Sequence, residues 1–197
     1  VGASQGISHV LVADHAYALP GSVLVCGDSH TCSAGAFNCA ARGTGAPDMF
    51  YAVTKGETWF RVGETIRYDL KGTLETPVSM KDVFLYIADT YGSHANQNVE
   101  FGGDALPRLS MNARRTMTTM CAELSAEFAT FEPDEILLDY VRARNPAAFE
   151  EQYPDNDAKY LYRRSIDLSA MEPLVALPDT VLNNSQKVGD VCGTKIN

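Results

Sequence analysis

The chain has 197 residues, of which 45% are hydrophobic and 21% charged, and its 16 Lys and Arg against 25 Asp and Glu give a formal net charge of −9. This length and composition are typical of one large or two small globular domains, and the negative charge argues against nucleic-acid binding because it repels phosphates. No stretch approaches the roughly 18 uninterrupted apolar residues of a membrane span, so no membrane partner is expected.

The first part of the chain predicts two short strands followed by a helix. Apolar, β-branched runs at residues 8–13 and 21–28 are bounded by Gly or Pro, which is typical of buried strands. Pro47 and Asp48 indicate the start of a helix over residues 45–60, where apolar residues recur at helical spacing. The N-terminus has neither an initiator Met nor the basic segment of a secretory signal, so we expect a fragment or a processed chain.

The remaining residues alternate between strand and helix patterns. Strand patterns cover 64–74, 97–104 and the start of 162–178, helix patterns cover 79–92, 109–131 and 134–144, and a polar stretch predicts an exposed excursion over 145–160. Ser79 and Ser110 are candidate N-caps, and Gly92 is a candidate helix stop. The alternation predicts an α/β fold with helices on the faces of sheets, and a domain boundary near residues 60–63.

Asp28, Ser29 and His30 stand side by side at the end of the second predicted strand, in the stretch VCGDSHTCSAGAF. Ligands of α/β proteins bind at the ends of parallel strands, and the small residues that follow allow a ligand or a neighbouring helix to approach the backbone closely. Ser29 lacks the G-x-S-x-G frame of a nucleophile elbow. From the residues alone, the triplet is either one wall of a binding site or a capped strand end whose imidazole has ordinary hydrogen-bond partners.

Two further residues are candidates for the same site. His9, on the first predicted strand, is a second imidazole in an apolar run. Glu123 stands among apolar neighbours on the long predicted helix, and if it is buried it needs a cationic or hydrogen-bonding partner. The alternative is an exposed Glu on the wet face of an amphipathic helix. His94 is expected to be a surface-loop histidine.

The cysteines indicate a reducing compartment, either the cytoplasm or an organelle matrix. Their number is odd and they are widely spread with no C-x-x-C pair, which fits neither a secreted disulfide framework nor a zinc site. The five are Cys26, Cys32, Cys39, Cys121 and Cys192. Of these, we expect Cys26, Cys32, Cys121 and Cys192 to be small apolar fillers.

Four consecutive segments together resemble the aconitase superfamily, in particular the large subunits of 3-isopropylmalate dehydratases and homoaconitases: GISHVLVADHAYALPGSVLVCGDSHTCSAGAF, WFRVGETIRYDLKGTL, VSMKDVFLYI and MTTMCAEL. The resemblance runs from about Gly6 to the last residue, and its G-D-S-H-T core is highly specific. It implies three-layer α/β/α units. Residues 1–60 would be the C-terminal part of a first α/β domain, 61–172 a second α/β domain, and 173–197 a segment leading into a third domain that is absent.

The resemblance also implies an activity. Enzymes of this family dehydrate a 2-hydroxy di- or tricarboxylate and rehydrate the alkene, using a [4Fe-4S] cluster whose one iron without a cysteine ligand binds the departing hydroxyl. By the motif, Asp28 would pair with His9 and Glu123 with His30, while Ser29 would hydrogen-bond to substrate or to its neighbours. Each carboxylate would fix the tautomer of its imidazole and raise its pKa.

Other parts of the family's machinery are expected outside this chain. The family's cluster cysteines follow the point where the chain stops, so no cluster is expected in this chain alone, which should then be inactive. A small swivelling subunit or domain is the expected partner. The substrate is expected to be isopropylmalate. Homoaconitate, citrate and dimethylmalate are alternatives, because Thr119 stands where the family often has Asn. A non-catalytic split subunit or binding domain with the same fold is the alternative to an enzyme.

Overall fold

The fold is described by a computed structural model that covers residues 5–195, so the outermost ends of the first and third expected segments, 1–4 and 196–197, lie outside the described residues. The helices are α1 (Ser8–Asp14), α2 (Ala46–Lys55), α3 (Met80–Tyr91), α4 (Met111–Met120) and α5 (Glu135–Arg142), with 3₁₀ segments η1 (Ser29–Phe37), η2 (Leu106–Arg108), η3 (Cys121–Leu124), η4 (Leu168–Ala170) and η5 (Val188–Val191). The strands are β1 (Val23–Cys26), β2 (Ala40–Gly43), β3 (Thr65–Lys71), β4 (Asn98–Gly102), β5 (Ala129–Phe131), β6 (Tyr162–Asp167), β7 (Leu174–Ala176) and β8 (Ser185–Lys187). The predicted α/β class is confirmed. No helix among the described residues is long and apolar enough to cross a bilayer.

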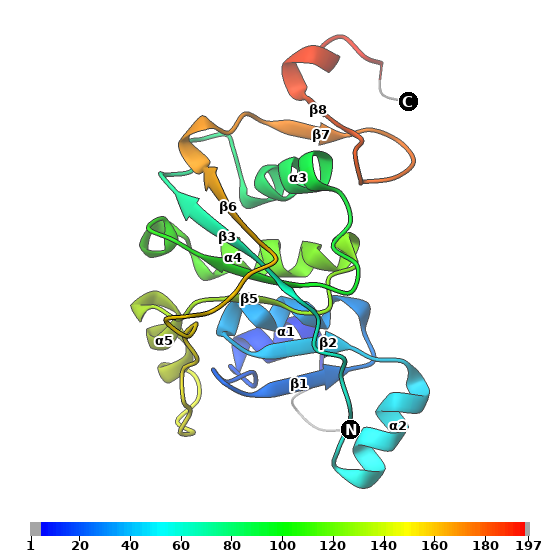
Figure 1. Ribbon diagram of the computed structural model, residues 1–197, viewed down its shortest axis with the longest axis vertical. Helices are drawn as coiled ribbons and strands as arrows, with labels where there is room; N and C mark the ends of the chain where they lie inside the picture. The colour runs from blue at the N-terminus through cyan, green and yellow to red at the C-terminus, as the bar shows by residue number, and fades with distance from the viewer. Residues whose placement is uncertain (1–4, 196–197) are drawn as a thin grey trace.

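The larger sheet has the strand order β5-β4-β3-β6, and all its strands are parallel. Ile66, Tyr68 and Leu70 alternate along β3 and enter one hydrophobic core together with residues of α3 and the end of α4. Figure 1 shows α3 between this sheet and the antiparallel pair β7–β8. The strand expected at the start of 162–178 is therefore β6, which pairs with β3.

The smaller N-terminal sheet is the parallel pair β1–β2, connected by η1. Its core consists mostly of alanines with Phe37, and it includes residues of α5 from much later in the chain. A Cβ added to Gly35 of η1 would lie 1.6 Å from the Ala129 carbonyl oxygen of β5. The small-residue run after the Asp-Ser-His triplet thus serves the close approach of η1 to the larger sheet. The domain boundary near residues 60–63 stays a prediction.

Local sequence signals correctly predict where α3 and α4 begin. Asp82 accepts hydrogen bonds from the backbone N–H and the hydroxyl of Ser79, each at 2.7 Å, and α3 ends at Gly92. Ser110 caps α4 by accepting from the Ala113 N–H. These caps satisfy backbone donors that the first turn of a helix leaves free.

Residues 8–13, predicted as a strand, form the helix α1 instead. Val12 and Ala13 of the helix pack into the N-terminal core together with Ala16, which follows the helix, while Val10 is exposed. Tertiary packing of this face outweighs the β propensity of the valines, which is a weak preference in a run this short.

The predicted helix over 109–131 is also wrong in its second half. It stops at Met120, tightens into η3, and then turns at Ser125, whose φ is 60° in the left-handed region. Ala129 to Phe131 then pair with β4. The helix is shorter than expected because β4 offers this segment an unpaired edge with which to complete the sheet.

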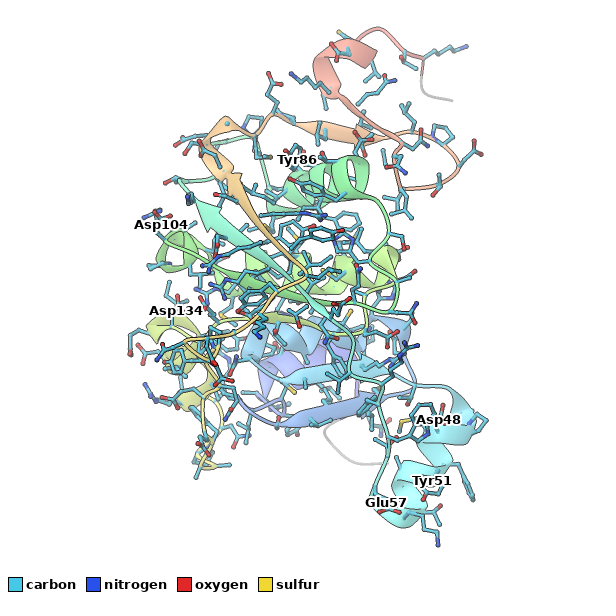
Figure 2. All side chains as sticks on the ribbon, viewed as in Figure 1. Asp48, Tyr51, Glu57, Tyr86, Asp104 and Asp134 are labelled. Carbon is cyan, nitrogen blue, oxygen red and sulfur yellow. The ribbon has the colours of Figure 1, made fainter. Side chains whose placement is uncertain are left out.

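Helix α2 projects away from the rest of the protein in Figure 1, and none of its residues is buried. Its apolar side chains Phe50 and Val53 are exposed. In Figure 2 the labelled side chains Asp48, Tyr51 and Glu57 lie on this projection, and the Tyr51 hydroxyl donates to Glu57 at 3.0 Å.

His94 is buried, which corrects the expectation of a surface-loop histidine. Its Nδ1–H donates to the Gly92 carbonyl at 2.9 Å, so Nε2 accepts from the Tyr68 hydroxyl at 2.7 Å. Arg164 in turn donates to the Tyr68 oxygen at 2.8 Å. Burial, assisted by the nearby Arg164 charge, lowers the pKa of His94 below its ordinary value, so the imidazole is neutral at pH 7.

The free energy of unfolding is therefore expected to fall as the pH is lowered through about 6.5, because His94 binds a proton more readily in the unfolded chain than in the folded one. Urea unfolding at about pH 7.5 and about pH 5.5 measures this slope. His94→Gln, which does not titrate, should give a less stable protein with a shallower slope. An unchanged slope would mean that other groups carry the pH dependence.

Candidate active site

The Asp28–Ser29–His30 triplet lies at the end of β1, where the chain enters η1. Asp28 caps η1, and its Oδ1 accepts from the His30 backbone N–H at 2.7 Å. The backbone kinks at His30, which takes the conformation φ −92°, ψ 18° inside the 3₁₀ segment. A Cβ on Gly43 of β2 would lie 2.3 Å from the Asp28 carbonyl oxygen, so only Gly fits beside the triplet.

His9 on α1 forms the first imidazole–carboxylate pair of the site. Its Nε2 lies 3.1 Å from Asp28 Oδ1, and its Nδ1 lies 3.4 Å from the Ser33 hydroxyl. An ionised carboxylate only accepts, so Nε2 carries the proton in the neutral ring and Nδ1 accepts from Ser33. Asp28 thereby fixes both the tautomer and the orientation of His9.

His30 forms the second pair with Glu123 of η3. His30 Nε2 lies 3.0 Å from Glu123 Oε1, and its Nδ1 lies 3.1 Å from the Ser29 hydroxyl. The same reasoning makes Nε2 the donor to Glu123 and Nδ1 the acceptor from Ser29. Both pairs thus have the same arrangement, with a carboxylate on Nε2 and a serine hydroxyl on Nδ1.

The site is negatively charged and open to solvent. The backbone N–H of His30 lowers the pKa of Asp28, the two nearby imidazoles lower it further, and partial burial opposes them, so Asp28 is ionised at neutral pH. The four paired side chains are between 28% and 45% exposed. Both pairs are therefore partly accessible to solvent.

All five residues singled out from the sequence come together at this site, and both contacts implied by the resemblance are present. The sequence left two alternatives for Glu123, a buried side chain with a partner or an exposed one. Glu123 is exposed, and it also has a partner in His30. Ser33 was missed by the sequence reasoning. No local pattern could have found it, because its role depends on how α1 folds back over η1.

Hydrogen bonds tie the two segments that carry His30 and Glu123. Thr118 of α4 donates from its hydroxyl to the Ser33 carbonyl at 3.0 Å, and the Cys32 thiol contacts the Thr119 carbonyl at 3.7 Å. Thr118 is fully buried. η1 and the end of α4 therefore form one rigid support beneath the two pairs.

An ion pair between Arg42 of β2 and Glu127 connects β2 to the segment that follows η3. The Glu127 side chain is 16% exposed and follows the turn that carries Glu123, whereas Arg42 is 34% exposed. Replacing Arg42 with Met is expected to lower the free energy of unfolding by about 1–3 kcal/mol, because it leaves a largely buried carboxylate without its cation.

Urea unfolding of Arg42→Met and of the double variant Arg42→Met/Glu127→Met checks this. The double variant should recover part of the loss, since it removes the unpaired charge as well. A double variant that loses the sum of both single effects would show that the two side chains are not coupled.

All five cysteines are free thiols, and Cys32 and Cys121 are buried as expected of apolar fillers, as is Cys39. Burial raises the pKa of the Cys32 and Cys39 thiols to about 11 and that of Cys121 well above its ordinary value. Cys26 is partly buried, and Cys192 is exposed, so the expectation of a buried filler is wrong for Cys192. Among residues 5–195, no group of three His, Cys, Asp or Glu could hold a metal ion. These residues do not fit an iron–sulfur cluster.

Comparisons with known proteins show which family the chain resembles over its length. The family model described as "Aconitase family (aconitate hydratase)" matches residues 1–190. The chain is 45% identical over 192 residues to the 3-isopropylmalate dehydratase large subunit of Mycolicibacterium smegmatis, a match that covers 98% of this chain and 46% of that protein. It is 38% identical over 194 residues to a probable methanogen homoaconitase large subunit of Methanosarcina mazei, covering 98% and 49%. The chain thus spans about half the length of the relatives it matches.

Proposed function

Because the chain belongs to the aconitase family, we propose that the protein containing it is a hydro-lyase that dehydrates and rehydrates a 2-hydroxy di- or tricarboxylate, with 3-isopropylmalate as the first candidate substrate. The observation that carries this proposal is the pair of imidazole–carboxylate contacts, His9–Asp28 and His30–Glu123, on one open surface. Dehydration needs a proton for the departing hydroxyl and a base for the adjacent carbon, and imidazoles held by carboxylates can serve either purpose.

This chain's own residues would hold and move protons. A proton on the Ser29 hydroxyl can pass to Nδ1 of His30, and Glu123 stabilises the imidazolium that forms. Asp28 supports the same charge on His9. In the family, a [4Fe-4S] cluster supplies a Lewis acid for the departing hydroxyl, and we infer that its ligands come from the part of the protein outside this chain.

Partners and compartment belong to the same proposal. Relatives named as large subunits imply a small subunit, which we expect to cover the open side of the two pairs and complete the site. The free thiols suit a reducing compartment, and we propose the cytoplasm.

The second candidate is a non-catalytic module that keeps the fold as a binding or scaffold subunit. Residues 5–195 have the fold and the polar surface but no set of cluster ligands, which is the composition that such a module would have. The reading frame around this chain distinguishes the two, because an enzyme needs a cysteine motif and a C-x-x-C elsewhere in the same polypeptide or in its partner.

The test is to purify the full protein with its small subunit and to reconstitute it anaerobically with iron and sulfide. The rate of alkene formation is then measured by ultraviolet absorbance with isopropylmalate, homocitrate, citrate and dimethylmalate. Turnover of one of them supports the proposal. A reconstituted cluster with no turnover of any hydroxy acid would favour the binding module.

A further inference from the structure

We propose that Arg115, together with polar side chains on the same face of α4, forms a subsite that receives a carboxylate group of the substrate. This inference rests on the proposed hydro-lyase function, and it assigns to this chain a substrate-binding residue in addition to the two imidazole–carboxylate pairs.

A cavity of about 400 Å³ lies directly beside His9, between α1, η1 and α4. Asn112, Arg115, Thr116 and Thr119 line it from α4. Their spacing of three and four residues places them on one face of the helix. These side chains bring an amide, a guanidinium and two hydroxyls to a lining that also includes the apolar Met120 and lies next to His9.

Arg115 supplies the positive charge of this cavity. Its Nη2 donates to the His9 carbonyl oxygen at 3.0 Å, which anchors the guanidinium at the cavity's inner end. Arg42 and Arg114 each contact a carboxylate, whereas no acidic side chain of residues 5–195 forms an ion pair with Arg115. A guanidinium presents five donors in a planar fork, so donors remain for an anionic ligand.

The neighbouring side chains suit the same ligand. No Asp or Glu lines the cavity itself, and the nearby Asp28 carboxylate is paired with His9 Nε2. The Asn112 amide and the hydroxyls of Thr116 and Thr119 can each donate to its oxygens. A carboxylate bound to Arg115 would hold the rest of the molecule against His9, which is where a proton is to be exchanged.

A rival explanation is that Arg115 acts only by positioning His9 through its carbonyl. The two explanations differ in what they change. Loss of a positioning residue lowers kcat and leaves the affinity for a carboxylate ligand intact. Loss of a carboxylate receptor weakens binding of substrate and of unreactive analogues alike.

The experiment uses the full protein with its small subunit and the variant Arg115→Met. Tricarballylate, an unreactive tricarboxylate, is the calorimetric probe, and KM and kcat are measured in parallel. We expect its Kd and the substrate KM to rise about 10- to 100-fold, the size of a lost charged hydrogen bond, with kcat changed about threefold or less. Arg108→Met is the matched control, since Arg108 is an exposed arginine that pairs with Asp104. It should leave both constants unchanged.

Asn112→Asp is the second variant, because Asn112 is exposed and the substitution should not disturb folding. It adds a negative charge to the cavity lining, and it should weaken tricarballylate binding even if Arg115→Met fails to fold. Unchanged Kd and KM in the folded variants, or a loss of kcat alone, would overturn the subsite. Wild-type protein that binds tricarballylate through Arg115 but turns over no hydroxy acid would leave the subsite standing and remove the proposed function.

Discussion

Replacing Glu123 with Gln is expected to lower kcat of the assembled enzyme by about 10²-fold or more, the scale of a lost acid–base function. Glu123 Oε1 lies 3.0 Å from His30 Nε2, and its negative charge is what stabilises a proton on the ring. Gln can still accept the hydrogen bond through its amide oxygen, but it offers no charge. The imidazolium then forms less readily, whereas substrate binding, and with it KM, should change little. Steady-state alkene formation by the reconstituted enzyme measures both constants.

Asp28→Asn tests the other pair by the same logic. Asn is as good an N-cap as Asp, so the hydrogen bond from the His30 N–H to the side chain can persist while the charge next to His9 is lost. Glu135→Gln on α5 is the matched control, because the Glu135 side chain is exposed and its ion-pair partner is Arg142 and no residue of the site. Near wild-type rates in both Asp28→Asn and Glu123→Gln would rule out the two pairs as the acid–base machinery.

Local signals in the sequence were enough where a residue acts on its immediate neighbours. The Ser79 and Ser110 caps and the Gly92 stop each depend on hydrogen bonds or dihedral angles within one helical turn. The Asp28 carboxylate at the end of β1 is of the same kind, since it accepts from the backbone two residues further on. Such features are predictable because the two partners of each contact lie within a few residues of each other in the sequence.

Contacts between distant segments were not derivable in this way. His30 and Glu123 are 93 residues apart, and only the resemblance to a family suggested that they meet. The β-branched run at 8–13 and the segment after Glu123 were misassigned because packing against η1 and the free edge of β4 decides their conformation. His94 looked like a loop residue, and its burial depends on Tyr68, on a strand that precedes it by a whole helix.

The residues of the site therefore differ in how well the sequence predicts them. A specific motif identified the residues that carry the chemistry, whereas the residues that support them have no motif. Ser33, Thr118 and Arg115 are recognisable only once α1, η1 and α4 are placed against one another.

Replacing Arg114 with Met is expected to lower the free energy of unfolding by about 3–5 kcal/mol, the cost of breaking a buried ion pair. Arg114 has no exposed surface, and its guanidinium donates to both oxygens of Asp134, at 2.7 and 2.6 Å. It also donates to the Leu106 and Leu109 carbonyls at 2.8 and 3.3 Å. Met fills much of the volume, but it leaves the Asp134 carboxylate without its cation and the Leu106 and Leu109 carbonyls without their side-chain donor. Urea unfolding measures the loss.

Asp134, labelled at the start of α5 in Figure 2, makes this effect separable from simple packing. It caps α5 by accepting from the Leu137 N–H at 3.1 Å, and Asn can do the same without a charge. The double variant Arg114→Met/Asp134→Asn should therefore be more stable than Arg114→Met alone, because the unpaired charge is gone while the cap remains.

Arg114→Lys should recover only part of the loss, since an ammonium cannot form the two-pronged contact. Arg108→Met, which breaks the exposed pair with Asp104, should cost no more than about 0.5 kcal/mol. If the double variant were no more stable than Arg114→Met, the cost would lie in the lost carbonyl contacts and packing, and the ion pair would add nothing to the junction of α4 and α5.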